Sequence, residues 1–164
     1  MSWKMSFMRR GIALSVALLA LSAAHATPNL DGLAGAWSGA GQMRPKDGAW
    51  EKVRCKVAYG VTKPGKAFSL DLKCASDAYK MSLSANIEQN GAQLSGNWFE
   101  SEYRQGGKIS GTSTDDGLIQ ARIEGETVAA LVTIKTKGNH QSFVMDAPGS
   151  WLSQVAIELN KEAR

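Results

Sequence analysis

Two stretches of this sequence decide the fold: Val53-Arg54-Cys55-Lys56-Val57-Ala58-Tyr59 and Phe68-Ser69-Leu70-Asp71-Leu72-Lys73-Cys74. In each, apolar and polar side chains alternate with a period of two, which is typical of a β-strand with one buried face. Residues 60–66 lie between them and carry the glycines and the proline of a loop. The sequence therefore predicts a β-hairpin over residues 53–74.

The two cysteines fall into register in this hairpin. Pairing Tyr59 with Leu70 brings the apolar faces together and also places Cys55 opposite Cys74. The Cβ atoms of directly opposed residues in an antiparallel pair are close enough for a disulfide. We therefore predict a Cys55–Cys74 disulfide, and an even cysteine count fits an oxidising compartment.

The rest of the chain continues in short alternating segments separated by glycine-containing turns, and helical signals are nearly absent. Strands are predicted at residues 34–41, 53–59, 68–74, 79–87, 94–100, 108–112, 118–124, 127–136, 141–145 and 155–159, with a break at Gly106-Gly107. Sequential hairpins without a crossover helix indicate a meander, and closing it removes the exposed edge strands. The predicted fold is all-β: one antiparallel up-and-down β-barrel of about 8–10 strands over residues 27–164.

The N-terminus has the three parts of a secretory signal. A basic head with Lys4 and Arg9-Arg10 precedes an apolar stretch, residues 11–24, which ends in Ala24-His25-Ala26. The apolar part is shorter than the ~20 residues of a transmembrane helix. We predict a signal peptide over residues 1–26 cleaved after Ala26, a periplasmic or secreted product, and no stable membrane anchor.

The charge of the full chain is misleading. It has 19 Lys and Arg against 15 Asp and Glu, a net charge of +4, but three of the cationic residues lie in the signal peptide. The 16 that remain are interspersed with the acidic residues and form no run of like charge. This distribution argues against a nucleic-acid partner.

After the signal peptide, the chain contains few side chains that could act as a nucleophile, a general base or a metal ligand. His140 is the only imidazole there, and both cysteines are expected in a disulfide, so neither a His/Cys nucleophile pair nor a His/Cys metal site can be assembled. Glu100 and Glu102 could share a strand face as a carboxylate pair, but we expect them to be solvated at a strand end. The sequence predicts no enzyme activity and no cofactor or metal.

The segment Leu33-Ala34-Gly35-Ala36-Trp37-Ser38-Gly39-Ala40-Gly41 resembles the first strand of calycin-type barrels, a group that includes lipocalins, avidins and nitrobindin-like proteins. Lipocalins carry Gly-x-Trp there, and nitrobindin-like barrels carry the longer Gly-x-Trp-x-Gly-x-Gly pattern. The resemblance implies a tryptophan, Trp37, that packs across one barrel end and an interior that holds a small apolar or amphipathic ligand. A nitrobindin-like haem site needs a histidine near the chain end; since His140 lies in an apparent turn, haem binding is not expected.

The chain is also similar to small secreted barrels that inhibit bacterial metalloproteases, which begin with a Gly-x-Trp strand and have one disulfide. That resemblance implies that an N-terminal segment, here residues 27–32, could reach into a protease cleft. The favoured interpretation of this segment is a loose tail, because chain termini are often poorly ordered.

We therefore expect an exported, non-enzymatic binding protein of the bacterial cell envelope that carries or sequesters a small apolar or amphipathic ligand. A protein-binding module, such as a hydrolase (protease) inhibitor, and an envelope structural protein remain alternatives. For a protein-binding module, Trp50 and Trp151 could form an exposed recognition patch. A carrier instead requires a cavity of about a few hundred Å³. The predicted cavity residues are Trp37, Tyr59, Leu70, Leu72, Met81, Leu83 and Trp98.

Overall fold

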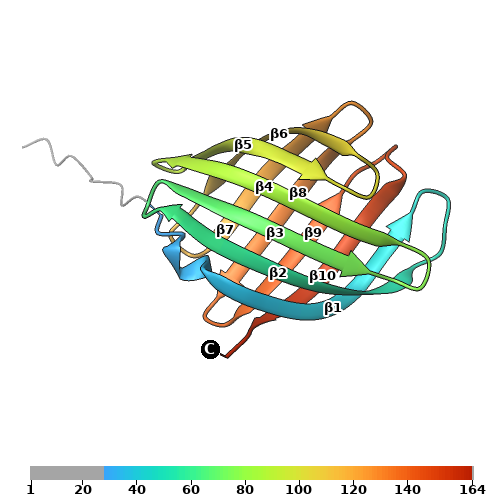
Figure 1. Ribbon diagram of the computed structural model, residues 1–164, viewed down its shortest axis with the longest axis horizontal. Helices are drawn as coiled ribbons and strands as arrows, with labels where there is room; N and C mark the ends of the chain where they lie inside the picture. The colour runs from blue at the N-terminus through green and yellow to red at the C-terminus, as the bar shows by residue number, and fades with distance from the viewer. Residues whose placement is uncertain (1–27, 164) are drawn as a thin grey trace, which may run out of the picture.

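The computed structural model describes residues 28–163, which form a closed barrel of ten antiparallel strands behind one short 3-10 helix, η1 (Asp31–Leu33). Each strand pairs with its neighbours along the chain, and β1 closes the barrel against β10 (Figure 1). The predicted all-β up-and-down barrel is confirmed. The predicted signal peptide, residues 1–26, lies outside the described residues. The strands are β1 (Gly35–Pro45), β2 (Glu51–Lys63), β3 (Ala67–Ala75), β4 (Lys80–Asn90), β5 (Gln93–Glu100), β6 (Gln105–Ser113), β7 (Leu118–Gly125), β8 (Ala129–Lys137), β9 (His140–Asp146) and β10 (Leu152–Lys161).

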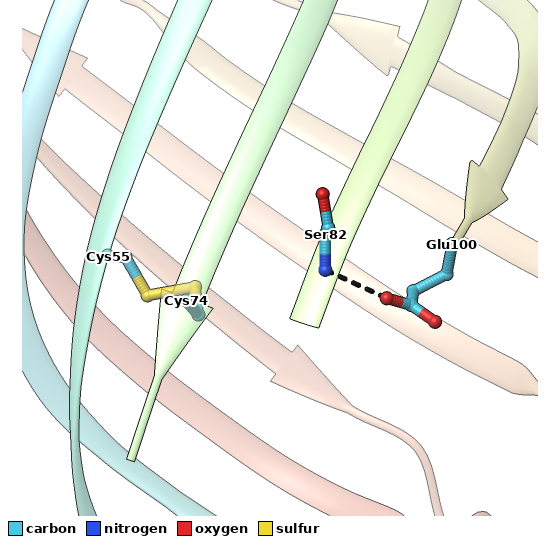
Figure 2. Close-up of a disulfide and its surroundings, with 4 residues drawn as sticks. All are labelled: Cys55, Cys74, Ser82 and Glu100. Atoms are coloured by element: carbon cyan, nitrogen blue, oxygen red, sulfur yellow. Dashed lines mark hydrogen bonds between the residues drawn. A yellow bond between two sulfur atoms is a disulfide. The ribbon is translucent and has the colours of Figure 1, made fainter. Parts of the chain in front are cut away.

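The hairpin β2–β3 has the predicted register. Tyr59 is paired with Leu70 and Cys55 with Cys74, and a disulfide joins the two cysteines, whose Cα atoms are 4.1 Å apart. Figure 2 shows this bond on two adjacent strands. The disulfide prediction is confirmed, and it agrees with an oxidising compartment. Within residues 28–163, no helix has both the length and the apolar character needed to cross a membrane.

One predicted boundary is wrong. Gly106 and Gly107 do not break the meander but lie inside β6, and the turn falls at residues 101–104, which contain neither glycine nor proline. Gly107 is needed for close strand packing, since a Cβ there would lie 1.8 Å from the carbonyl oxygen of Glu124 on β7. The glycine thus marks a close approach of two strands, which sequence alone does not distinguish from a turn.

The barrel has two different ends. We call "the mouth" the end formed by the loops at residues 46–50, 76–79, 101–104, 126–128 and 147–151. We call "the closed end" the one that carries η1 and the loops at residues 64–66, 91–92, 114–117 and 138–139. In Figure 1, η1 (blue) lies at the left and the β1–β2 loop of the mouth at the right.

The segment before β1 packs on the closed end. Leu30 and Leu33 are buried in the hydrophobic core, and the side chain of Gln89 donates a hydrogen bond of 2.6 Å to the carbonyl oxygen of Pro28. Asp31 accepts a bond from the backbone amide of Gly65. The prediction of a loose tail is therefore wrong for residues 28–32. A segment held in this way is not free to enter a protease cleft. The structure therefore gives no support to protease inhibition by insertion of this segment.

Candidate ligand-binding site

The interior of the barrel contains a cavity of about 120 Å³. Every strand contributes at least one side chain to its wall, and the exposed wall atoms are all apolar. This arrangement follows from the alternation along each strand, because one residue in two points into the barrel. The cavity is therefore a dry apolar site.

Six of the seven predicted cavity residues line this wall: Tyr59, Leu70, Leu72, Met81, Leu83 and Trp98. They come from four consecutive strands, β2 to β5, where the alternation in the sequence is clearest. The structure brings them together around one space. Whether they contact a ligand remains a prediction.

Trp37 lies outside the cavity wall. Its side chain is fully buried, and its indole Nε1 donates a hydrogen bond of 2.8 Å to the carbonyl oxygen of Leu33. Its ring meets the ring of Tyr59 edge-on, with the centroids 6.4 Å apart. Trp37 therefore fills the closed end between η1 and the cavity, which is the packing that the calycin resemblance implies.

Trp98 lines the cavity and also packs toward the mouth. Its indole Nε1 donates to the carbonyl oxygen of Glu124 at 3.2 Å. A Cβ on Gly125 would lie 2.9 Å from the indole ring, so the absence of a side chain at that position makes room for Trp98. Trp98 therefore lines the cavity, as predicted, and also fills space in the core at its mouth side.

The second half of the chain supplies wall residues that we did not predict. They belong to β6, β7, β8 and β9, and their period-two alternation was the signal that could have identified them. These residues include Ile109, Ile119, Ile123, Val132, Ile134 and Phe143.

A buried hydrogen-bond chain lies between the cavity and the closed end. The Tyr59 hydroxyl donates to Oε1 of Gln141 at 2.9 Å, and Nε2 of Gln141 donates to Oγ1 of Thr136 at 2.9 Å. Gln141 is fully buried. Burial of the phenol strongly raises the pKa of Tyr59 above its ordinary value. The phenol is therefore neutral and fixed, with its ring facing the cavity.

Three aromatic side chains gather at the mouth, and we call them the aromatic cap: Tyr79, Tyr103 and Trp151. The ring centroid of Trp151 lies 4.7 Å from that of Tyr103 and 5.6 Å from that of Tyr79. The prediction that Trp151 belongs to an exposed patch is wrong, since it is partly buried against the core, whereas Trp50 is 47% exposed.

A smaller pocket of about 70 Å³ lies below the cap, lined in part by Tyr103 and Trp151. It shares wall residues with the main cavity, among them Met81, Trp98 and Met145. The same side chains thus separate the two spaces. A path from the mouth to the interior runs past two flexible methionines.

Glu100 holds the mouth loop that carries Tyr103. Its carboxylate is buried and accepts backbone hydrogen bonds from Ser82 at 2.8 Å, Glu102 at 3.1 Å and Tyr103 at 2.7 Å. Figure 2 shows the first of these bonds, from β4 to Glu100. The expectation that Glu100 is solvated at a strand end is wrong, because three backbone N–H groups donate to its carboxylate in place of water. Glu102 is exposed in the turn, so the two do not form a facing pair.

Desolvation raises the pKa of the Tyr103 phenol, and the nearby Glu100 carboxylate raises it further. The Tyr103 phenol is therefore uncharged at neutral pH. The rings of Tyr103 and Trp151 line the pocket below, which suits an apolar or amphipathic molecule.

The closed cavity is smaller than a carrier for a large ligand requires. A site for a drug-sized molecule is typically about 300–1,000 Å³, whereas a dry apolar cavity of about 150 Å³ binds benzene. At about 120 Å³, this cavity accommodates a molecule of roughly benzene size unless its wall moves. The expected void of a few hundred Å³ is not present in this conformation of residues 28–163.

No family model matches the chain, and no curated protein matches it in sequence. Solved structures match in fold. The structure of Rv2717c from M. tuberculosis aligns with a TM-score of 0.65 at 16% identity and covers 82% of this chain and 95% of that one. The S-type phycobiliprotein lyase CPES from Guillardia theta aligns with a TM-score of 0.56 at 12% identity and covers 82% of this chain and 90% of that one. Both alignments cover most of each chain, and the barrel agrees with the calycin-like fold that the resemblance implies. These matches do not test the Gly-x-Trp-x-Gly-x-Gly motif.

Proposed function

We propose that this chain is a non-enzymatic binding protein, exported to the bacterial cell envelope, that holds a small apolar or amphipathic ligand in the barrel. The observation that carries the proposal is the dry cavity below the aromatic cap, walled entirely by apolar atoms. Removing a ligand's apolar surface from water contributes about 25 cal/mol per Å². Such a wall therefore favours an apolar molecule without any specific polar contact.

The ligand is small, or the wall adapts to it. Three methionines, Met43, Met81 and Met145, line the cavity, and the unbranched thioether side chain changes rotamer at low cost. Movement of Met81 and Met145 would merge the cavity with the pocket below the cap, since both residues line both spaces. The merged site could accept a short alkyl chain or a single ring with a substituent.

Entry is through the mouth. At the closed end, η1 and Trp37 fill the barrel, and the Tyr59–Gln141–Thr136 hydrogen bonds lie behind the cavity. At the mouth, the pocket below the cap shares Met81 and Met145 with the cavity, so movement of these flexible side chains would connect the two spaces. We therefore place the route of exchange between the loops at residues 101–104 and 147–151.

The position of the only histidine after residue 27 supports a non-enzymatic role. His140 lies on the outer surface, where its imidazole contacts the Glu158 carboxylate at 2.9 Å and the side-chain oxygen of Asn160 at 3.2 Å. Within the described residues, the wall of the main cavity offers no carboxylate or imidazole for proton transfer, and the Glu100 carboxylate of the pocket below the cap is engaged by three backbone amides. Although one fold neighbour is described as a lyase, we propose binding without chemistry for this chain.

Native mass spectrometry of the protein purified from its own envelope compartment, followed by solvent extraction, tests the proposal. We expect a small apolar molecule that co-purifies and is released on denaturation. Ala85→Leu adds three carbon atoms at the cavity wall and should abolish retention. Ala156→Leu adds the same atoms on the exposed outer wall and is the matched control. Retention that is equal in both variants would contradict binding in the barrel.

A further inference from the structure

The outer wall over β1 to β4 carries a groove on the opposite side of the barrel wall from the cavity, with Cys74 and Met81 in the lining of both. It encloses about 640 Å³ and is lined by four cationic side chains, Arg54, Lys56, Lys73 and Lys80. All four are exposed and point away from the barrel interior, since they alternate with inward residues along their strands. The groove is therefore accessible without any movement of the cap.

The strand register sets Lys56 directly opposite Lys73. The same row continues to Ser38 on β1 and Ser82 on β4, so it crosses four adjacent strands as Ser-Lys-Lys-Ser. The Cβ atoms of opposed residues are about 5 Å apart, and like charges in that position destabilise a sheet. Two lysines held this closely can direct both ammonium groups to one anion, and the serine hydroxyls flank it as donors.

The neighbouring row completes the cationic group. Arg54 lies opposite Ala75, and Ala75 lies opposite Lys80, with Ala40 on the far side of Arg54. This row is two residues further along the strands, which corresponds to about 7 Å. Because Ala75 is short, it forms part of the groove floor between longer cationic side chains.

The four cations lack acidic partners at contact distance. Within residues 28–163, the ion pairs are Arg122–Glu124 and His140–Glu158, and neither includes a residue of the groove. Carboxylates lie around it as well: Glu102 on its rim, Asp77 in the hollow that also contains Lys80, Asp71 in the next row and Glu158 beyond Ala40. Of these only Glu102 lines the groove itself, so the groove lining has an excess of positive charge. The even spread of charge along the sequence concealed it, since only the register of β2, β3 and β4 collects these residues.

We propose that this groove binds a small soluble molecule that carries one or two phosphate groups. Paired lysines and an arginine within two adjacent rows match the charge of a phosphate or a diphosphate, and charge-assisted hydrogen bonds to such oxygens are the stronger kind. The groove is an open depression whose two cationic rows lie about 7 Å apart, a spacing that suits one compact anionic group. The site is independent of the proposed ligand in the barrel.

Isothermal titration calorimetry of the exported chain with inorganic pyrophosphate, at low ionic strength, tests the proposal. We expect saturable binding. The double variant Lys56→Gln/Lys73→Gln should weaken it by at least about tenfold, because the loss of one hydrogen bond to a charged group lowers the affinity by about that factor or more. The control, Lys135→Gln/Lys137→Gln, removes the same charge from two exposed lysines of β8 and should change the affinity less than about twofold.

A second variant, Arg54→Gln/Lys80→Gln, tests the neighbouring row if the first variant does not fold, as judged by circular dichroism. Absence of binding at millimolar pyrophosphate would overturn the proposal. Equal losses in the groove and control variants would overturn it too, because they would indicate unspecific attraction to net charge. Binding to phosphatidylglycerol vesicles without binding to pyrophosphate would assign the groove to a membrane surface instead.

Discussion

Trp151 packs on Tyr103 at the mouth of the barrel, with ring centroids 4.7 Å apart and ring planes inclined by 46°. The two residues come from different loops, so their contact joins the β5–β6 turn to the β9–β10 loop across the opening. Both rings also line the pocket below the cap. This contact is the feature that controls access to the cavity in our account.

Replacing Trp151 with alanine should open the mouth. We expect a faster exchange of a small apolar probe such as benzene, measured by NMR line shapes, and a loss of about 1–3 kcal/mol in the free energy of unfolding from lost aromatic packing. Trp50→Ala is the control, because Trp50 is half-exposed and outside the cap. Exchange rates that are equal in the two variants would argue against entry at the cap.

Glu100→Gln should destabilise the mouth loop. The Glu100 carboxylate accepts hydrogen bonds from three backbone N–H groups. In glutamine an NH2 group replaces one carboxylate oxygen and cannot accept a bond, so at least one backbone N–H loses its partner. We expect a decrease of about 1–3 kcal/mol in the free energy of unfolding, measured with urea. Glu102→Gln, on the exposed side of the same turn, should change it by less than about 0.5 kcal/mol. Equal effects would show that the buried carboxylate does not organise the turn.

Tyr59 should make stability depend on pH in the alkaline range. Its pKa in the folded chain is raised above its ordinary value of 10.0, so the unfolded chain releases the phenolic proton first. The stabilisation is complete below pH 10 and is lost as the pH rises above it. Tyr59→Phe should remove this part of the slope and, by leaving Oε1 of Gln141 without its donor, cost about 1–3 kcal/mol at neutral pH. An unchanged slope in urea titrations above pH 10 would contradict this assignment.

Relief of the Lys56–Lys73 repulsion should stabilise the barrel when no anion is bound. Lys73→Gln is expected to raise the free energy of unfolding by about 0.2–1 kcal/mol at low ionic strength. Added sodium chloride should reduce that gain, because salt screens exposed charges. Lys135→Gln serves as the control, since the residue paired with Lys135 on β7 is Leu118. A gain that persists unchanged in high salt would point to a cause other than charge.

The hairpin of Cys55 and Cys74 could be predicted from the sequence because a period of two fixes both the buried face and the register. The same alternation identified six of the wall residues of β2 to β5. Other features depend on contacts between distant segments. The turn at residues 101–104 has no glycine or proline and is held by Glu100, and the segment before Gly35 is held by Gln89 and Gly65, neither of which is a neighbour in sequence.

The size of the cavity and the groove could not be predicted either. Cavity volume depends on how side chains from all ten strands fill the interior, and a pattern of apolar positions does not specify it. The groove exists because Lys56 on β2 meets Lys73 on β3, and Ala75 on β3 meets Lys80 on β4. Along the chain these cations alternate with other residues and show no cluster.

The most direct test of the ligand-binding account is an NMR titration of the methyl-labelled chain with benzene. We predict saturable shifts at the methyl groups of Leu72, Leu83 and Ile123 on the cavity wall, and none at the exposed Leu131 and Val144 of the outer wall. Ala85→Leu should abolish the shifts of the inner methyl groups. Inner methyl groups that do not respond, or that respond equally in Ala85→Leu, would contradict the claim that this barrel binds an apolar molecule inside.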